Sequence, residues 1–106
     1  MSKLQQSLAE GRFTFTGEVG PPKGTNLHHA LEGAELMKDK VAAINVTDLQ
    51  TAVMRLGSLA VCAKLVERGI EPVFQMVCRD RNRLALQSNL LNAAEKGLQS
   101  AFQGAR

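Results

Sequence analysis

The sequence lacks tryptophan and tyrosine, and four phenylalanines are its only aromatic residues. Proteins that bind single-stranded nucleic acids stack the bases on aromatic side chains, so this composition argues against a nucleic-acid partner. The two cysteines, Cys62 and Cys78, lie sixteen positions apart and form no Cys-x-x-Cys motif. Because this pattern suits neither a zinc site nor a disulfide framework, we expect reduced thiols and a cytoplasmic protein.

Long apolar runs are also missing. The first residues, MSKLQQSLAEG, contain no apolar signal core, and no later run approaches the length that spans a membrane. The net charge is only +3, and basic residues bunch only at Arg79, Arg81 and Arg83. The 106 residues suffice for one small soluble domain, for which we expect no membrane partner.

A repeating order of strand, turn and helix runs through the chain. We expect strands in RFTFTG, where Phe13 and Phe15 alternate with threonines, and in the apolar runs VAAINV (residues 41–46) and EPVFQMVC (residues 71–78). The strand starts recur about every 30 residues, which is the length of a βα unit. This alternation predicts an α/β protein with three βα units of a parallel sheet.

A stretch with the helical spacing of apolar residues follows each predicted strand. We expect the last of these helices to bury Leu86, Leu90, Ala93 and Ala94. Polar residues suited to an N-cap precede the helices, and glycines suited to a left-handed C-terminal cap end the second and third. The candidate caps are Asn26, Ser58, Asn82, Gly69 and Gly97.

Three parallel strands do not close a barrel, since a (β/α)8 TIM barrel needs eight βα units and about 250 residues. After Gly97 the chain reads LQSAFQGAR, whose small polar residues make a poor buried strand. We therefore interpret residues 1–106 as a single partial domain, with residues 99–106 as a tail or a helix extension. Because an open sheet exposes its edges, we expect a homo-oligomer or a partner chain that covers them.

Polar residues follow the predicted strands at their carboxyl ends, where parallel sheets bind ligands. Glu18 is either a surface acid in a turn or a general acid, since burial among Gly, Val and Pro would favour its protonated form. Thr47 and Asp48 either begin the next segment, with Asp48 as a cap, or contact a bound cofactor or substrate.

The charged turn RDRNR (residues 79–83) precedes a helix N-terminus, a place that attracts anions. It is either internally paired and solvated, or an anion site that uses Arg79. The stretch GPPKG lacks the spacing of a phosphate loop and predicts a rigid turn, although Lys23 could meet an anionic ligand. His28 and His29 are adjacent on a helix and point about 100° apart, which argues against a shared metal.

Three stretches carry a family resemblance: FTFTGEVGPPKG, AAINVTD and EPVFQMVCRDRNRLALQSNLLNAAEKGL. Together they resemble the start of methylenetetrahydrofolate reductase, the flavin enzyme of one-carbon metabolism. The resemblance covers about residues 10–98 and only the first third of the family's barrel. It implies a (β/α)8 flavoprotein that binds FAD rather than FMN. A nicotinamide nucleotide or another donor reduces the flavin, which passes hydride to methylenetetrahydrofolate and gives methyltetrahydrofolate.

The resemblance also implies roles for single residues. Glu18 matches the family's acid, which assists the opening of the five-membered ring of the folate. Thr47 matches a threonine that contacts the flavin, and Gln75 stands where some members carry a histidine that contacts the flavin. Three further candidates for cofactor contacts lie at the matching strand ends, namely Asp48, Arg79 and Asn82.

The family's fourth strand, with its Leu-Thr-Gly-Asp type of ending, and its later flavin-binding and folate-binding loops have no counterpart in the sequence. We therefore expect an N-terminal fragment of the reductase that has no activity alone. Two alternatives stay open: a non-catalytic α/β interaction module that self-associates, and a small anion-binding domain that uses the RDRNR turn. The electron donor and the oligomeric state also stay open.

Overall fold

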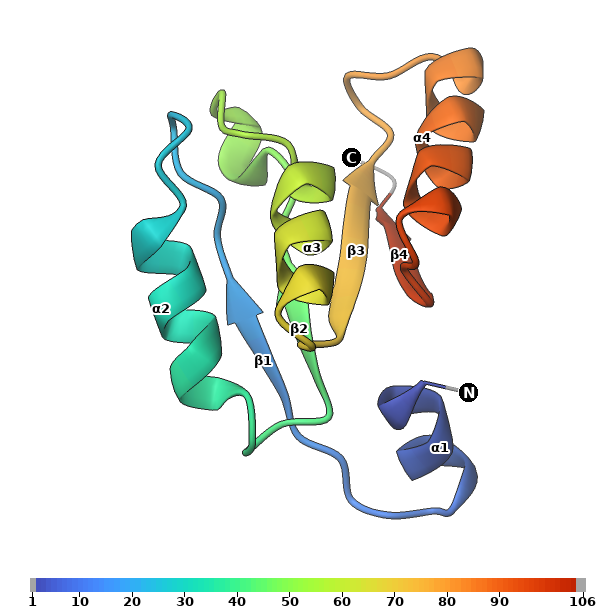
Figure 1. Ribbon diagram of the computed structural model, residues 1–106. Helices are drawn as coiled ribbons and strands as arrows, with labels where there is room; N and C mark the ends of the chain where they lie inside the picture. Colours follow the sequence, from blue (N-terminus) through green and yellow to red (C-terminus); the bar gives the residue numbers. More distant parts are fainter. Residues whose placement is uncertain (1, 105–106) are drawn as a thin grey trace.

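The computed structural model describes residues 2–104, with side chains as far as Ser100. After a short N-terminal helix, strands and helices alternate along the chain (Figure 1). The elements in chain order are α1 (Lys3–Ala9), β1 (Thr16–Val19), α2 (His28–Met37), β2 (Ala43–Val46), the 3-10 helix η1 (Gln50–Ala52), α3 (Ser58–Glu67), β3 (Pro72–Val77), α4 (Arg83–Glu95) and β4 (Ser100–Gly104).

The strands form one open sheet in the order β1-β2-β3-β4, and every neighbouring pair is parallel. The register places Glu18 of β1 beside Asn45 of β2, and Asn45 beside Val73 of β3. The predicted α/β fold, with βα units on a parallel sheet that does not close into a barrel, is confirmed. The carboxyl ends of all the strands consequently lie at one edge of the sheet.

The prediction for the C-terminal segment is wrong over residues 100–104. This segment was expected to be a tail or a helix extension, and it forms β4, which pairs with β3 from Val73↔Ser100 to Val77↔Gly104. The sequence SAFQG has little intrinsic strand preference, but the edge of β3 offers it unpaired backbone groups, and tertiary context overrides propensity. Residues 105–106 lie outside the described part.

The first strand begins later than the alternation of phenylalanines predicts. β1 starts at Thr16, and Phe13 and Phe15 lie before it, 86% and 65% exposed, with their rings in an edge-to-face contact at 5.0 Å. The segment that joins α1 to β1 packs against α1: the hydroxyls of Ser7 and Thr14 lie 2.6 Å apart. The two phenylalanines therefore form a small exposed apolar patch before the start of β1.

Three predicted caps are confirmed, and one is wrong. Asn82 accepts a hydrogen bond from the backbone N–H of Ala85 at 2.8 Å, and Gly69 and Gly97 follow their helices with φ of +73° and +83°. Ser58 is not an N-cap, because Gly57 occupies that position. The Ser58 hydroxyl instead donates to the carbonyl oxygen of Gln75 at 2.6 Å, which ties α3 to β3.

The predicted cap Asn26 serves α2 from one position further out than expected. Leu27 is the N-cap residue of α2, and it makes no side-chain cap hydrogen bond. The side-chain oxygen of Asn26 accepts from the backbone N–H of His28 at 3.0 Å, so Asn26 still supports the first turn.

One face of the sheet packs against α2, α3 and α4 and forms the core. Buried apolar residues of the strands meet buried residues of the helices there, and the cluster consists of Val19, Leu31, Ala34, Ile44, Val46, Val61, Cys62, Leu65, Ile70, Phe74, Met76 and Ala93. The face that α4 buries is narrower than expected. Ala93 is buried and Leu86 is half-buried, whereas Leu90 and Ala94 are exposed, as are Leu84 and Leu91.

The sequence reading missed the N-terminal helix α1. The hydroxyl of Ser2 caps it by accepting from the backbone N–H of Gln5 at 3.0 Å. The Glu71 carboxylate, just before β3, accepts from the backbone N–H groups of Lys3 and Leu4 at 2.7 and 3.0 Å. A carboxylate at a helix N-terminus satisfies free donors and the helix dipole, so Glu71 anchors α1 near the amino ends of the strands.

Candidate functional site

The second face of the sheet, which we call the open face, carries polar side chains. Residues alternate along each strand, so Val19, Val46 and Phe74 point to the core, while their neighbours Glu18 and Asn45 point away from it. A cavity of about 800 Å³ lies over the open face, lined by strand residues and by α1. The polar residues and the cavity make this face the candidate site.

Glu18 lies on the open face, one residue before the carboxyl end of β1. Its side chain is exposed and forms no hydrogen bond or ion pair with any residue that the structure describes. It lines the cavity together with Asn45 and Gln75. The structure thus places the predicted acid at the expected edge of the sheet, inside the strand rather than after it, and leaves it open to solvent.

Gln75 is the second predicted residue on this face. Its side-chain nitrogen Nε2 donates to Oδ1 of Asn45 at 3.4 Å, and Nδ2 of Asn45 donates to the carbonyl oxygen of Gly17 at 3.2 Å and to Oγ1 of Thr16 at 3.3 Å. Hydrogen bonds between side chains therefore cross from β3 through β2 to β1. Asn45, the middle residue, was missed in the sequence reading, although it is the only polar residue in the run VAAINV.

Thr47 follows β2 directly and is only 7% exposed. Its backbone N–H donates to the carbonyl oxygen of Val19 at 3.3 Å, and a Cβ added at Gly20 would lie 3.7 Å from its hydroxyl. That hydroxyl is fully buried and has no hydrogen-bond partner in the described part of the chain. An orphaned buried hydroxyl is rare in proteins, and a ligand or a water molecule commonly satisfies such a group.

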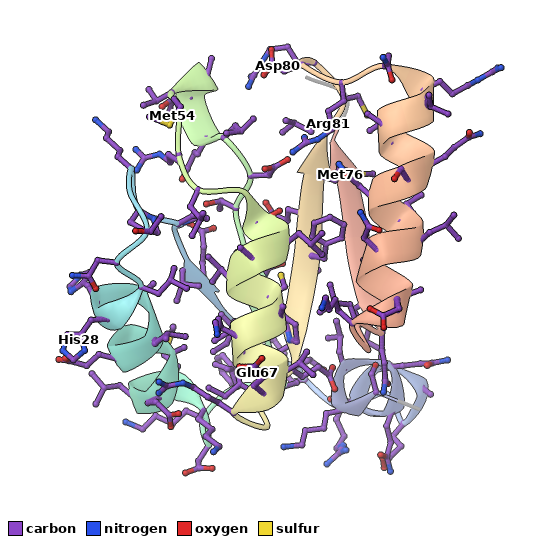
Figure 2. All side chains as sticks on the ribbon, turned by 45° about the horizontal axis from the view of Figure 1, so that its top comes forward. His28, Met54, Glu67, Met76, Asp80 and Arg81 are labelled. Carbon is purple, nitrogen blue, oxygen red and sulfur yellow. The ribbon has the colours of Figure 1, made fainter. Side chains whose placement is uncertain are left out.

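Asp48 does not face the cavity. Its side chain is fully buried and receives two hydrogen bonds from Arg81, at 2.6 and 3.3 Å, and a third from the backbone N–H of Val77 at 3.0 Å. Arg81 lies on the loop between β3 and α4, beside the upper end of the sheet (Figure 2). The carboxylate of Asp48 is thus occupied in holding this loop to the end of β2.

Arg79 and Asn82 also have protein partners. Arg79 pairs with the exposed carboxylate of Asp80 at 2.8 Å, and the hydrogen bond that Arg79 donates to this carboxylate raises the pKa of Arg79. Arg79 also donates to the carbonyl oxygen of Leu49 at 3.4 Å, while Asn82 serves as the N-cap of α4. The RDRNR turn is therefore internally paired at Arg79 and Arg81, which favours the structural interpretation of this turn over the anion site.

The histidines of α2 lie away from the cavity. His28 points outward (Figure 2) and pairs with the exposed Glu32 at 3.2 Å, one helical turn further on. Within residues 2–104 no group of three or more His, Cys, Asp or Glu side chains could hold a metal ion. No helix of this described part is both long and apolar enough to cross a membrane.

The comparisons with known proteins agree with this geometry. The family described as methylenetetrahydrofolate reductase matches residues 3–103 of the 106-residue chain. No curated protein and no solved structure matches the chain. The family consists of folate-related oxidoreductases, which are generally flavin-dependent. Because the match spans nearly the whole sequence, the chain belongs to the methylenetetrahydrofolate reductase family.

Proposed function

We propose that this chain carries the proton-donating part of a flavin-dependent methylenetetrahydrofolate reductase, with Glu18 as the general acid. The family match supports the reaction class. One observation carries the role of Glu18: this acid has no partner among the described residues, and it lines a cavity of about 800 Å³ over the open face. Asp48 and Glu71, by contrast, are occupied by hydrogen bonds and do not line this cavity.

The chemistry assigned to Glu18 is proton donation to the folate. Its carboxyl group would give a proton to the ring nitrogen that leaves when the five-membered ring of methylenetetrahydrofolate opens, which produces the iminium that accepts hydride. When bound, FAD supplies that hydride after reduction by a nicotinamide nucleotide or another donor. The residues around Glu18 must hold the folate so that this nitrogen lies within hydrogen-bond reach of the carboxyl group.

The open face fits a ring system better than it fits a phosphate. A volume of about 800 Å³ lies within the range of ligand sites, and a carboxamide such as that of Gln75 can form hydrogen bonds with a heterocycle. No Lys, Arg or His is among the residues that line this cavity, so the pyrophosphate of FAD would lie elsewhere. Gln75 would contact the ring. Thr47 does not line this cavity, so its orphaned hydroxyl would contact another part of a bound cofactor.

We propose that Glu18 becomes an effective acid only when further strands cover the open face. A general acid that works near neutrality needs surroundings that disfavour its charge, and Glu18 is exposed on this sheet. A family barrel has eight strands, of which the described part supplies four. The chain alone would therefore bind ring ligands weakly and show no turnover. We propose that it works in the cytoplasm.

Two assays test this proposal. We expect the chain, mixed with FAD, reduced nicotinamide and methylenetetrahydrofolate, to turn over no faster than free FAD. Addition of a polypeptide that supplies the later strands of a family barrel should restore turnover, and Glu18→Gln should then abolish it. A matched control is Glu32→Gln on α2, outside the lining of this cavity, which should change nothing. If Glu18→Gln leaves the restored turnover intact, the acid role is wrong.

A second candidate function is a non-catalytic interaction module. The exposed pair Phe13 and Phe15 and the unpaired edge of β1 favour it, because apolar patches and such edges mark association surfaces. Light scattering after size-exclusion chromatography should then show a defined oligomer that Phe13→Ser with Phe15→Ser dissociates. If the protein is a monomer at all concentrations, the interaction module is ruled out and the reductase proposal remains.

A further inference from the structure

The side-chain hydrogen bonds on the open face have a fixed direction. Asn45 lies between two strands and donates through Nδ2 to the carbonyl oxygen of Gly17, at 3.2 Å. A carbonyl oxygen can only accept, so the amide nitrogen of Asn45 must face β1 and its oxygen Oδ1 must face β3. The backbone of β1 therefore determines how the Asn45 amide is turned.

The same reasoning passes to Gln75. Since Oδ1 of Asn45 can only accept, the group that Gln75 turns towards it, at 3.4 Å, must be Nε2. The oxygen Oε1 of Gln75 is left without a hydrogen bond to any residue in the described part of the chain. A carboxamide that can rotate by about 180° could offer either its oxygen or its nitrogen to a ligand. The hydrogen bond to Asn45 fixes the orientation of the Gln75 carboxamide, so that its oxygen is the atom available to a ligand.

Two hydrogen-bond acceptors consequently serve the same cavity. Oε1 of Gln75 is one, and the carboxylate of Glu18, also without a partner among the described residues, is the other. The cavity lining includes no Lys, Arg or His, so nothing in it recruits an anion. A neutral ring that presents an N–H donor would complement the available oxygen of Gln75.

We propose that Gln75 selects a heterocycle through a ring N–H of the imide or lactam type, and that Asn45 is the positioning residue that sets the polarity of Gln75. This inference rests on the proposed function, which puts a heterocyclic ring on the open face. Flavin and pterin rings share this N–H next to a carbonyl group. The shared chemistry predicts that a methyl group on that nitrogen weakens binding.

Two pairs of ligands test whether Gln75 recognises a flavin ring or a pterin ring. The chain is titrated with riboflavin and N3-methylriboflavin, and with pterin and N3-methylpterin, while its amide resonances are followed by NMR, which detects weak binding. In one pair we expect the methylated ring to bind about 3- to 10-fold more weakly, the effect of one net hydrogen bond. The pair that shows the difference identifies the ring that Gln75 recognises.

Three variants test the direction of the hydrogen bonds. Asn45→Leu frees Gln75, so the preference for the unmethylated ring should fall below about twofold, while the affinity for the methylated ring stays the same within about twofold. Gln75→Leu should remove the preference by deleting the acceptor itself. Asn92→Leu on α4 is the matched control, since its side chain forms no hydrogen bond with a described residue, and it should keep the full preference.

The outcomes are distinguishable from failure of the proposed function. If the two members of each pair bind equally well, the inference is wrong. The acid role of Glu18 is not affected by this result, because the turnover assay tests it separately. Binding of none of the four rings also overturns the inference. If Asn45→Leu keeps the preference for the unmethylated ring, Gln75 does not depend on Asn45 and the positioning role is wrong. Retained binding of the methylated ring shows in each case that the variant is folded.

Discussion

Asp48 and Arg81 lie 33 positions apart in the sequence and form an ion pair at 2.6 Å, in which the Asp48 side chain is fully buried and that of Arg81 is 18% exposed. Arg81 also donates to the carbonyl oxygen of Val77, and Asp48 accepts from its N–H. The pair thus joins the segment after β2 to the loop after β3. These are two of the three strand ends where the sequence points to ligand contacts, the third being that of Glu18.

Loss of one partner of this pair should destabilise the protein strongly. We expect Arg81→Met to lower the free energy of unfolding by about 3–5 kcal/mol, because it leaves the buried charge of Asp48 without its counter-ion. Urea denaturation measures this change. Arg79→Met is the matched control: its pair with Asp80 is more exposed, so the change should be much smaller than that of Arg81→Met. Similar losses in the two variants would contradict the structural role of Asp48.

The buried thiol of Cys62 predicts a dependence of stability on pH. Burial, with a smaller contribution from the charge of Asp48, raises the pKa of Cys62 from 9.0 to about 12. Between these values the unfolded chain releases this proton and the folded chain keeps it, so the free energy of unfolding falls as the pH rises.

The size of this effect can be isolated with Cys62→Ala. The contribution of the thiol should reach at most about 1.4 kcal/mol per pH unit above pH 9. Denaturation curves at several alkaline pH values should therefore fall more steeply for the native sequence than for the variant. Parallel curves would show that the thiol ionises equally in both states.

Glu71 should determine whether α1 stays docked. We expect Glu71→Ala to cost about 1–3 kcal/mol in the local stability of α1, because two backbone N–H groups lose a charged acceptor. Hydrogen exchange of the α1 amides measures this loss. Glu67→Ala provides the comparison, since Glu67 is an exposed residue of α3 (Figure 2) that pairs only with Lys64 at 3.6 Å. Faster exchange of α1 in both variants would argue against the anchor.

Two glycines should respond to alanine with opposite sign. Gly69 has φ of +73°, so Gly69→Ala should lower the free energy of unfolding by about 1–2 kcal/mol through backbone strain. Gly33 lies inside α2, with open space where a Cβ would be, so Gly33→Ala should raise it by about 0.5–1 kcal/mol. Thermal unfolding of the two variants tests the contrast. A stable Gly69→Ala protein would mean that α3 ends differently.

The sequence predicts much of the fold because apolar runs and caps are local signals. The parallel strands around Ile44 and Phe74 follow from such runs, and Asn82 and Gly69 mark helix ends correctly. The side chains of SAFQG do not predict a strand. This segment becomes a strand because its backbone pairs with the edge of β3. Strand pairing is a property of two segments, so one of them alone cannot reveal it.

The candidate site was predictable in position but not in detail. Glu18 and Gln75 share the open face because both follow the alternation of their strands, which the sequence shows. The occupation of Asp48 by Arg81 depends on the path of a loop, for which no periodic pattern exists. The role of Asn45 depends on which backbone carbonyl lies opposite it, and only the register between β1 and β2 decides that.

The docking of α1 gives the open face one of its walls. Ser2, Leu4, Gln5 and Leu8 line the cavity beside the strands. Figure 1 shows α1 at the end of the sheet from which the strands start. The anchoring of α1 by Glu71 and the shape of the cavity are therefore linked, and a change that released the helix would also remove part of the surface available to a ring.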